Sequence, residues 1–340
     1  MSAWRDGLLG AAGELLWLSQ LPRLVRRLSR ARGLILRLER VLPEDVADFA
    51  PNAARQIKPA FLESVIERAR KLRLEIVDLD EAIRRIESED AANRFIVFTF
   101  DDAYRDMLRH ALPVLRRQQC PFTVYVTTAL VDGVGEIWPQ ALEEIVAGQN
   151  ALAVTQDGET EYLPSTTVEE KLAAYRALYR RMEGMAEAAR VQMIRDMSKQ
   201  YGLDLEAHCR SLSMDWTELR GLAADQLCTI GTRTVHGYDL AKLTPAEARS
   251  EIEQSRRVLR AQLGRAPVHL SYPEGAGPRE ASIARDLGLR SAVTTRPGGV
   301  YADDRNGLLS LPRIRLDGRL QSPRMIDTLL TPALAARLAG

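Results

Sequence analysis

The sequence predicts an α/β fold in which helices surround a mostly parallel sheet with a barrel-like form. From about residue 33 onward, short apolar runs alternate with longer segments of helical periodicity, the pattern of βα units around a parallel sheet. The chain has 340 residues, of which 46% are hydrophobic and 27% charged, so it can bury a large core. Residues 33–330 contain no linker long enough to split the series, so we expect one domain that carries an insertion.

The first half of the series predicts strands and helices in alternation. The run Ile96-Val97-Phe98-Thr99-Phe100 is almost wholly apolar, as expected for a strand that is buried on both faces. In an earlier segment, Phe61, Val65, Ile66 and Ala69 recur at helical spacing. We therefore expect strands at 33–38, 76–79, 95–100 and 122–126, and helices at 58–72, 80–86 and 104–118.

Residues 150–224 depart from this pattern and are expected to form the insertion. Residues 151–162 alternate around Asp157-Gly158, which predicts a β-hairpin with a type I′ turn. The remainder has helical periodicity, and Asp215 is the expected N-cap of a helix that begins at the next residue. The βα pattern then resumes with strands at 227–232, 268–272, 291–295 and 309–316, and helices at 245–263 and 279–287.

The N-terminal segment, residues 1–32, predicts an amphipathic helix outside the barrel-like domain. Apolar residues recur at helical spacing from Leu15 to Leu28, with arginines between the later ones. This pattern suits a helix packed on its own domain, and it also suits a helix on an anionic membrane surface. The segment has neither the ~18 uninterrupted apolar residues of a membrane span nor a signal-peptide layout. We expect a cytoplasmic protein, with peripheral contact at the inner face of the membrane as the alternative.

Charge and cysteine content exclude several classes of protein. The chain has 47 Lys and Arg against 46 Asp and Glu, a formal net charge of +1, so it lacks the surplus positive charge of a nucleic-acid-binding protein. Cys120, Cys209 and Cys228 form no CxxC motif and no Cys/His cluster. They indicate neither a disulfide framework nor a structural zinc site, and they favour a reducing compartment.

Two adjacent carboxylates stand at the end of a predicted buried strand. Asp101 and Asp102 directly follow the apolar run that ends at Phe100. In parallel βα folds the active site lies at the carboxyl ends of the strands. Because neighbouring residues of a strand end point in different directions, one carboxylate can hold a metal while the other acts as a base. The structural alternative is that one of them caps the helix that begins near Tyr104.

Three later segments also place polar residues after predicted strands. His236 follows one of these strands, and a lone histidine is either a hydrogen-bonded structural residue or a metal ligand. Tyr272 and Pro273 lie where another strand runs into a turn. Arg313 lies in the last apolar segment, where it could orient an anionic group or pair with a carboxylate.

Together these segments resemble the NodB-homology polysaccharide deacetylases, carbohydrate esterases that remove N-acetyl groups from sugar polymers. Thr99-Phe100-Asp101-Asp102 is similar to the first motif of the family. Tyr272-Pro273 and Leu311-Pro312-Arg313 are similar to later motifs of a bacterial subgroup linked to surface and capsular polysaccharide. The resemblance covers about residues 33–330 and implies a distorted (β/α) barrel. It also implies that Tyr272, Pro273 and Arg313 belong to the substrate-binding surface.

The resemblance assigns roles to the aspartate pair. In the family the first aspartate is the general base, and the second holds a divalent metal together with two histidines spaced His-x-x-x-His. Carried over by position, Asp101 is the expected base and Asp102 the expected metal ligand. The two histidine positions fall on Arg233 and Gly237, which cannot ligate a metal through their side chains. His236, one residue away, is the remaining candidate ligand for a zinc-like ion.

Two further residues depart from the family pattern at the same pocket. The histidine usual in the first strand is replaced by Glu39, which could act as a third ligand, and the glycine after the aspartate pair is replaced by Ala103. Arg233 offers the alternative of a salt bridge to Asp102, which would neutralise the pocket without a metal.

Two functions follow from these substitutions. The favoured one is a catalytically impaired or inactive family member of surface or exopolysaccharide metabolism, without a metal, that binds a carbohydrate polymer, an oligosaccharide or a partner protein of polysaccharide synthesis. The other is an active metal-dependent carbohydrate N-deacetylase, a hydrolase of carbon–nitrogen amide bonds. It would use Asp101 as the base and Asp102 with the displaced His236 as metal ligands.

Overall fold

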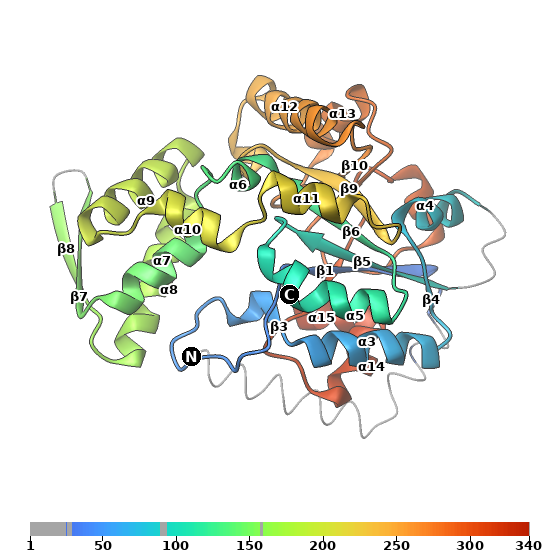
Figure 1. The fold of residues 1–340 in the computed structure, drawn as a ribbon, viewed down its shortest axis with the longest axis horizontal. Coiled ribbons are helices and arrows are strands. Elements are labelled where there is room, and N and C mark those ends of the chain that lie inside the picture. The colour runs from blue at the N-terminus through green and yellow to red at the C-terminus, as the bar shows by residue number, and fades with distance from the viewer. Residues whose placement is uncertain (1–24, 26–28, 89–93, 157–158, 340) are drawn as a thin grey trace.

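An eight-stranded sheet forms the centre of the molecule (Figure 1). The computed structural model describes residues 25, 29–88, 94–156 and 159–339. The sheet runs in the order β11-β10-β9-β6-β5-β1-β12, with β4 beside β5, and its paired strands are parallel. The strands are β1 (Gly33–Leu38), β4 (Glu75–Ile76), β5 (Phe95–Asp101), β6 (Phe122–Thr127), β9 (Cys228–Thr234), β10 (His269–Ser271), β11 (Ser291–Val293) and β12 (Ile314–Arg315).

The two edges of the sheet meet, which makes it a distorted barrel. Val293 at the end of β11 forms a parallel bridge with Leu311, just before β12. Backbone hydrogen bonds cross this seam from Leu311 N to Ala292 O and from Thr294 N to Leu311 O, both at 2.9 Å, although β10, β11 and β12 are only two or three residues long. The predicted βα barrel is therefore confirmed, with its seam between the two edge strands.

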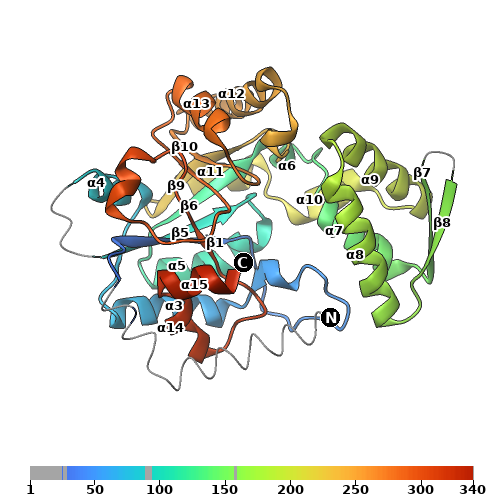
Figure 2. The same ribbon diagram turned by 180° about the vertical axis from the view of Figure 1, so that it is seen from behind.

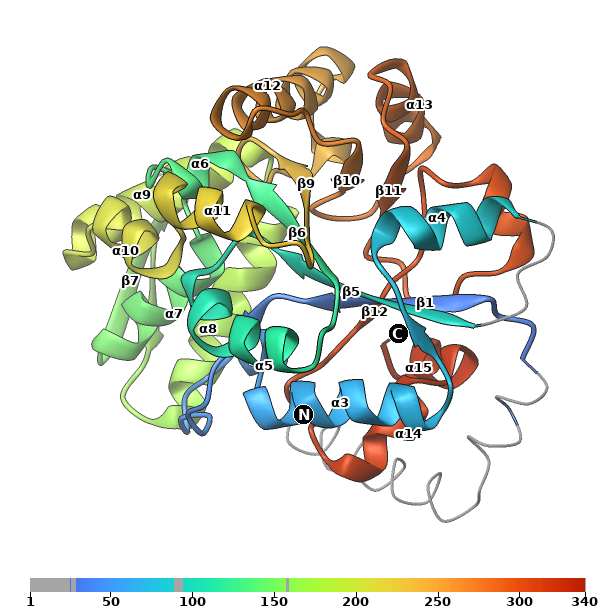
Figure 3. The same ribbon diagram turned by 45° about the vertical axis from the view of Figure 1, so that its right-hand side comes forward.

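Helices cover the outside of the barrel (Figure 3). The central strand β5 is buried along its whole length, as its apolar sequence predicts. The predicted helix at 245–263 has the bounds of α12, and Asp215 caps α11 by accepting a hydrogen bond from the amide of Glu218. The covering helices are α3 (Pro59–Lys71), α4 (Leu79–Glu87), α5 (Leu112–Arg117), α6 (Thr128–Val131), α11 (Trp216–Ala223), α12 (Pro245–Leu263), α13 (Pro278–Asp286), α14 (Ile326–Leu329) and α15 (Pro332–Ala339).

The predicted helix at 104–118 begins as a different kind of helix. Residues Met107–Ala111 form one π-helical turn before α5. Pro113 lies at the start of α5, where its missing amide and its ring disfavour a continuous α-helical hydrogen-bond ladder. Among the described residues, no helix combines the length and the apolar character needed to cross a membrane.

The insertion forms a lobe with its own hydrophobic core beside the barrel (Figures 1 and 2). It consists of α7 (Trp138–Gly148), the hairpin β7 (Ala151–Gln156) and β8 (Glu159–Pro164), α8 (Val168–Gly184), α9 (Glu187–Tyr201) and α10 (Leu205–Leu212). The lobe thus begins before residue 150, whereas α11 packs on the barrel through Leu219 and Leu222. The predicted turn at Asp157-Gly158 and most of the predicted helical segment 1–32 lie outside the described residues.

One glycine after β12 is required by close approach of the backbone. A Cβ at Gly318 would fall on the carbonyl oxygens of Ala53 and Gln56, and its own amide donates to Ala54 O at 3.1 Å. The chain after the barrel seam is therefore held against the turn that precedes β3 (Gln56–Ile57).

We expect Gly318→Ala to lower the free energy of unfolding by about 1–3 kcal/mol, because backbone atoms must move to admit the methyl group. Urea denaturation followed by circular dichroism measures this loss. Gly221 in α11 is the matched control, since nothing lies within 4 Å of the place where its methyl group would stand, and alanine favours a helix there by about 1 kcal/mol. Equal losses in the two variants would contradict the close-approach argument.

Candidate functional site

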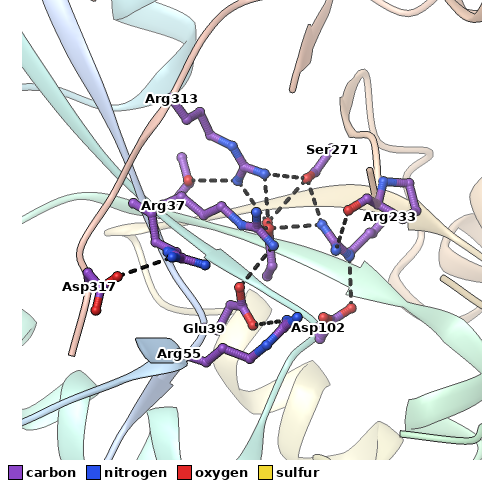
Figure 4. Close-up of polar contacts among 12 residues, drawn as sticks. Arg37, Glu39, Arg55, Asp102, Arg233, Ser271, Arg313 and Asp317 are labelled. Atoms are coloured by element: carbon purple, nitrogen blue, oxygen red, sulfur yellow. Dashed lines mark hydrogen bonds and ion pairs between the residues drawn. The ribbon is translucent and has the colours of Figure 1, made fainter. Parts of the chain in front are cut away.

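The carboxylate of Asp101, at the end of the central strand β5, is enclosed by three arginines, Arg37, Arg233 and Arg313, which Figure 4 labels. Its Oδ1 accepts hydrogen bonds from Arg313 Nη1 at 2.8 Å and Ser271 Oγ at 3.2 Å. Its Oδ2 accepts from Arg313 Nη2 and Arg37 Nε at 2.9 Å and from Arg233 Nη1 at 2.8 Å. Asp101 is completely buried, and both of its oxygens are surrounded by donors.

These contacts fix the ionisation of Asp101. Burial by itself raises the pKa of this carboxyl, but the positive charges of Arg233, Arg313 and Arg37 outweigh it and hold the pKa well below its ordinary value. A general base must accept a proton from a reacting group within hydrogen-bond reach. Asp101 does not line the cavity at the barrel mouth, and its lone pairs are already engaged.

Arg233 contacts both members of the aspartate pair. Besides its hydrogen bond to Asp101, its Nε forms an ion pair with Asp102 Oδ1 at 2.9 Å. The same Asp102 oxygen accepts a hydrogen bond from Thr127 Oγ1 at 2.7 Å. The salt bridge that the sequence offered as an alternative for Arg233 is therefore present. Burial lowers the pKa of Arg233, but the charges of Asp101 and Asp102 raise it well above its ordinary value.

Backbone irregularity aims Arg233 into the barrel. Val126 pairs with Thr232 and Thr127 pairs with Thr234, so Arg233 is an extra residue in β9, as at a β-bulge. Thr234 has a φ of 106°, which is rare for a β-branched residue. A bulge changes the direction of the side chain that it contains. The alternation of side chains along β9 therefore does not by itself predict where the Arg233 guanidinium points.

The aspartate pair itself ends in an unusual backbone conformation. Asp102 has a φ of 72° and Ala103 a φ of 52°, both in the left-handed region that favours glycine. The family glycine expected at position 103 therefore matches the backbone that the structure has. Alanine retains this conformation because the surrounding contacts hold it, at a cost of about 1–3 kcal/mol.

A second carboxylate, Glu39, extends the charged cluster toward the surface. It is 3% exposed and forms ion pairs with Arg37 Nη2 at 2.9 Å and with Arg55 Nη1 at 2.7 Å. Burial raises the pKa of Glu39, but Arg55 and Arg37 lower it to about 2. Glu39 is thus a link between two arginines. Carboxylates and guanidiniums alternate from Asp102 through Asp101 and Glu39 to Arg55 (Figure 4).

His236 is tied to helix α12. Its Nδ1 lies 2.7 Å from Glu251 Oε1, and Glu251 Oε2 accepts hydrogen bonds from the amides of Val235 and His236. The imidazole stacks on Tyr238, with ring centroids 4.8 Å apart. The hydrogen bond to Glu251 raises the pKa of His236 against the opposing effect of burial.

A cavity of about 240 Å³ lies between the barrel mouth and the insertion lobe. Asp102, Arg233, His236 and Pro273 line it from the barrel, and Trp138 is one of the residues that line it from the lobe. Gly237 lines it too, so the structure brings together five of the residues that the sequence singled out.

Tyr272 and Arg313, expected at the substrate-binding surface, are not among the lining residues. Tyr272 is 1% exposed, and its hydroxyl donates to Leu309 O at 3.0 Å. Arg313 is also 1% exposed and points to Asp101. The sequence did not single out Arg37 and Arg55 of the charged cluster, or Ser271, which is hydrogen-bonded to Asp101. The sequence feature that could have indicated this cluster is Arg37, a charged residue inside the apolar strand 33–38.

The residues present do not fit the three-ligand metal site that the resemblance implies. Arg233 occupies one histidine position, and its guanidinium lies against the carboxylate expected to hold the metal. Gly237, at the other position, has no side chain and a φ of 75°. Within the described part of the chain, no three His, Cys, Asp or Glu side chains gather in a way that could hold a metal ion.

A parallel βα barrel with a polar cavity at the carboxyl ends of its strands is the general design of a small-molecule or carbohydrate site. A family model described as polysaccharide deacetylase matches residues 88–154 and 176–292, more than half of the chain. The chain belongs to the polysaccharide deacetylase family. No curated protein matches it in sequence.

Solved structures share this fold at low sequence identity. The Streptococcus pyogenes deacetylase PplD in complex with acetate has a TM-score of 0.57 and 17% identity over 87% of this chain and 96% of its own. IcaB from Ammonifex degensii has a TM-score of 0.53 and 18% identity over 90% of this chain and 97% of its own. A de-N-acetylase from Aggregatibacter actinomycetemcomitans has a TM-score of 0.52 and 12% identity over 84% of this chain and 95% of its own. At these identities the likeness shows the fold alone.

We expect Asp101→Asn to destabilise the protein by about 3–5 kcal/mol, because it leaves buried guanidiniums without their shared charge. Urea denaturation at pH 7 measures the loss. The control Asp102→Asn, at a carboxylate whose side chain is 17% exposed, is expected to lose less. A loss at Asp101 no larger than that at Asp102 would contradict a central role for this carboxylate.

We also expect the stability difference between the wild type and Asp101→Asn to depend on pH. Because the pKa of Asp101 is lowered on folding, its stabilisation is complete above the unfolded value of about 3.9 and disappears as the pH falls through the lower folded value. The difference in unfolding free energy between wild type and Asp101→Asn should stay constant from about pH 7 to pH 5 and shrink below about pH 4. A difference that grows as the pH falls would contradict the assignment.

Proposed function

We propose that this protein is a non-catalytic member of the polysaccharide deacetylase family that binds a carbohydrate in the cavity at the barrel mouth. The observation that carries the proposal is the contact of Arg233 with both Asp101 and Asp102. A guanidinium is always protonated, so it supplies fixed positive charge between the two carboxylates. It offers no lone pair to a metal and it cannot activate a water molecule as a bound metal does.

The position of Asp101 also supports a site without hydrolytic chemistry. A base that deprotonates water has to reach it directly or through one further water. Asp101 is completely buried beneath the cavity lining and accepts hydrogen bonds from Arg37, Arg233, Ser271 and Arg313. Breaking these contacts to free the carboxylate would leave arginines buried without partners, at a cost of several kcal/mol.

The cavity lining suits a sugar. Trp138, Tyr179 and Tyr238 are half-buried aromatic side chains that line it, and Trp138 and Tyr179 lie with their ring centroids 4.7 Å apart. Such rings offer flat apolar faces, and the neighbouring Asp102 and Arg233 offer an acceptor and a donor for hydroxyl or acetamido groups. One solved structure of the same fold is a de-N-acetylase, which makes an N-acetylated oligosaccharide the ligand class to test first.

One contact favours the competing function of a metal-dependent N-deacetylase. Glu251 binds Nδ1 of His236, and a carboxylate on one imidazole nitrogen is the usual support for a histidine whose other nitrogen ligates a metal. Asp102 lines the same cavity. His236 and Asp102 would supply only two metal ligands, and the carboxylate of Asp102 is already paired with Arg233. The arrangement therefore supports a non-catalytic protein better than a metal-dependent enzyme.

Metal affinity separates the two functions. We expect isothermal titration with zinc chloride to show no stoichiometric binding to the wild type, and binding to appear in Arg233→His/Gly237→His, which restores two imidazoles beside Asp102. The left-handed φ of 75° at Gly237 weakens the restored site. The wild-type arm is therefore the decisive one. Stoichiometric zinc in the wild type that is lost in Asp102→Ala would overturn the proposal.

Carbohydrate binding is tested with chitotetraose, a neutral N-acetylated oligosaccharide. We expect the wild type to bind it without releasing acetate, and Tyr238→Ala to bind it about three- to tenfold more weakly, the value of one aromatic contact. Tyr162→Ala is the matched control, because Tyr162 is 75% exposed on the hairpin and does not line the cavity. Acetate release by the wild type, or equal affinity of the two variants, would count against the proposal.

A further inference from the structure

A second hollow, of about 680 Å³, adjoins the cavity between the insertion lobe and the barrel. Its walls come from helix α8 on one side and from β12 with the following loop on the other. Five arginines line it and define what we call the arginine groove: Arg55, Arg176, Arg180, Arg315 and Arg319.

The groove has a strongly positive lining. No aspartate or glutamate is among its lining residues within the described part of the chain. Arg315 and Arg319 form ion pairs with the same carboxylate, because their Nη2 atoms lie 3.1 Å and 2.7 Å from Asp317 Oδ2. On the opposite wall, Arg180 Nε donates to the backbone oxygen of Arg176. Guanidiniums on both walls face a common space, where an anion would relieve their mutual repulsion.

The groove and the cavity adjoin each other. Arg55 and Tyr179 line both of them. Arg55 Nη2 donates to the Tyr179 hydroxyl at 3.2 Å, while its Nη1 holds Glu39. The two hollows therefore meet at one hydrogen-bonded pair of side chains, and a ligand that reaches both has to pass over this pair.

The cavity and the groove differ in charge. Both acidic and basic residues line the cavity, including Asp102, Glu183, Glu274 and Arg233, whereas the charged residues that line the groove are arginines. A neutral polymer would gain nothing from this difference. A polymer with a neutral or N-acetylated sugar next to an acidic one would match it.

We propose that the arginine groove binds an anionic substituent, a carboxylate or a phosphate, on a sugar next to the one in the cavity. This inference rests on the proposed function, because it extends the carbohydrate site to a class of ligand, the acidic polysaccharides. Guanidiniums recognise carboxylates and phosphates through paired hydrogen bonds, and arginines from two elements can hold such a group from both sides.

The test uses isothermal titration of the full-length protein with tetragalacturonate, its methyl ester and glucose 6-phosphate. We expect one of the two anions to bind, with an affinity that falls as salt is added, and the methyl ester to bind about tenfold or more weakly than the free acid if the carboxylate is the recognised group. The anion that binds more tightly identifies the substituent.

Variants on both walls locate the binding. We expect Arg176→Gln/Arg180→Gln, and independently Arg315→Gln, to weaken binding of the anion about tenfold or more while chitotetraose binding is unchanged. Arg260→Gln is the matched control, because Arg260 is an exposed arginine on α12 that does not line the groove. Because the two variants change opposite walls, a local folding defect in one of them does not explain weaker binding by both.

The outcomes separate this inference from the proposed function. Binding of chitotetraose without binding of either anion overturns the groove alone. Anion binding that is equally strong in the wall variants and the wild type also overturns it. Failure of the wild type to bind any of the sugars overturns both the groove and the proposed function.

Discussion

The mouth of the barrel is organised around one buried negative charge. Asp101 receives hydrogen bonds from residues of β1, β9, β10 and the segment that leads into β12, so strands on both sides of the seam converge on one carboxylate. Removing ions from water is costly, and such a cluster is tolerated only when each charge has partners of opposite sign with good geometry. The bidentate contact from Arg313, between residues 212 apart in sequence, ties the segment that leads into β12 to the central strand β5.

Arg233 supplies positive charge at a position where the family resemblance of the sequence implies a metal-binding histidine. The carboxylates of Asp101 and Asp102 are therefore neutralised by a guanidinium. A guanidinium has fixed donors and a fixed charge, whereas a metal has open coordination positions. On the proposed function, the exchange retains a folded, polar cavity and gives up the chemistry that needs such a position.

The periodicity of the sequence was sufficient to predict the strands and helices that build the barrel. The apolar run before Asp101 and the helix at 245–263 are clear because burial imposes a period on the residues that face the core. The site was only partly predictable. The aspartate pair and the ion pair of Arg233 with Asp102 follow from position, but Arg37 and Arg55 join the cluster through contacts between distant segments. The bulge at Arg233 and the left-handed residues beside it depend on packing that no local pattern encodes.

The insertion lobe has its own core, yet polar contacts dock it against the barrel. Asn52 Nδ2 donates to Pro139 O at 3.0 Å, and the amide of Asp239 donates to Glu187 Oε1 at 3.1 Å. The cavity and the arginine groove both have one wall on the lobe and the other on the barrel, so each hollow exists only in the docked arrangement. A long ligand that touches both walls would add to the contacts that hold the lobe against the barrel, so its binding energy would also stabilise this arrangement.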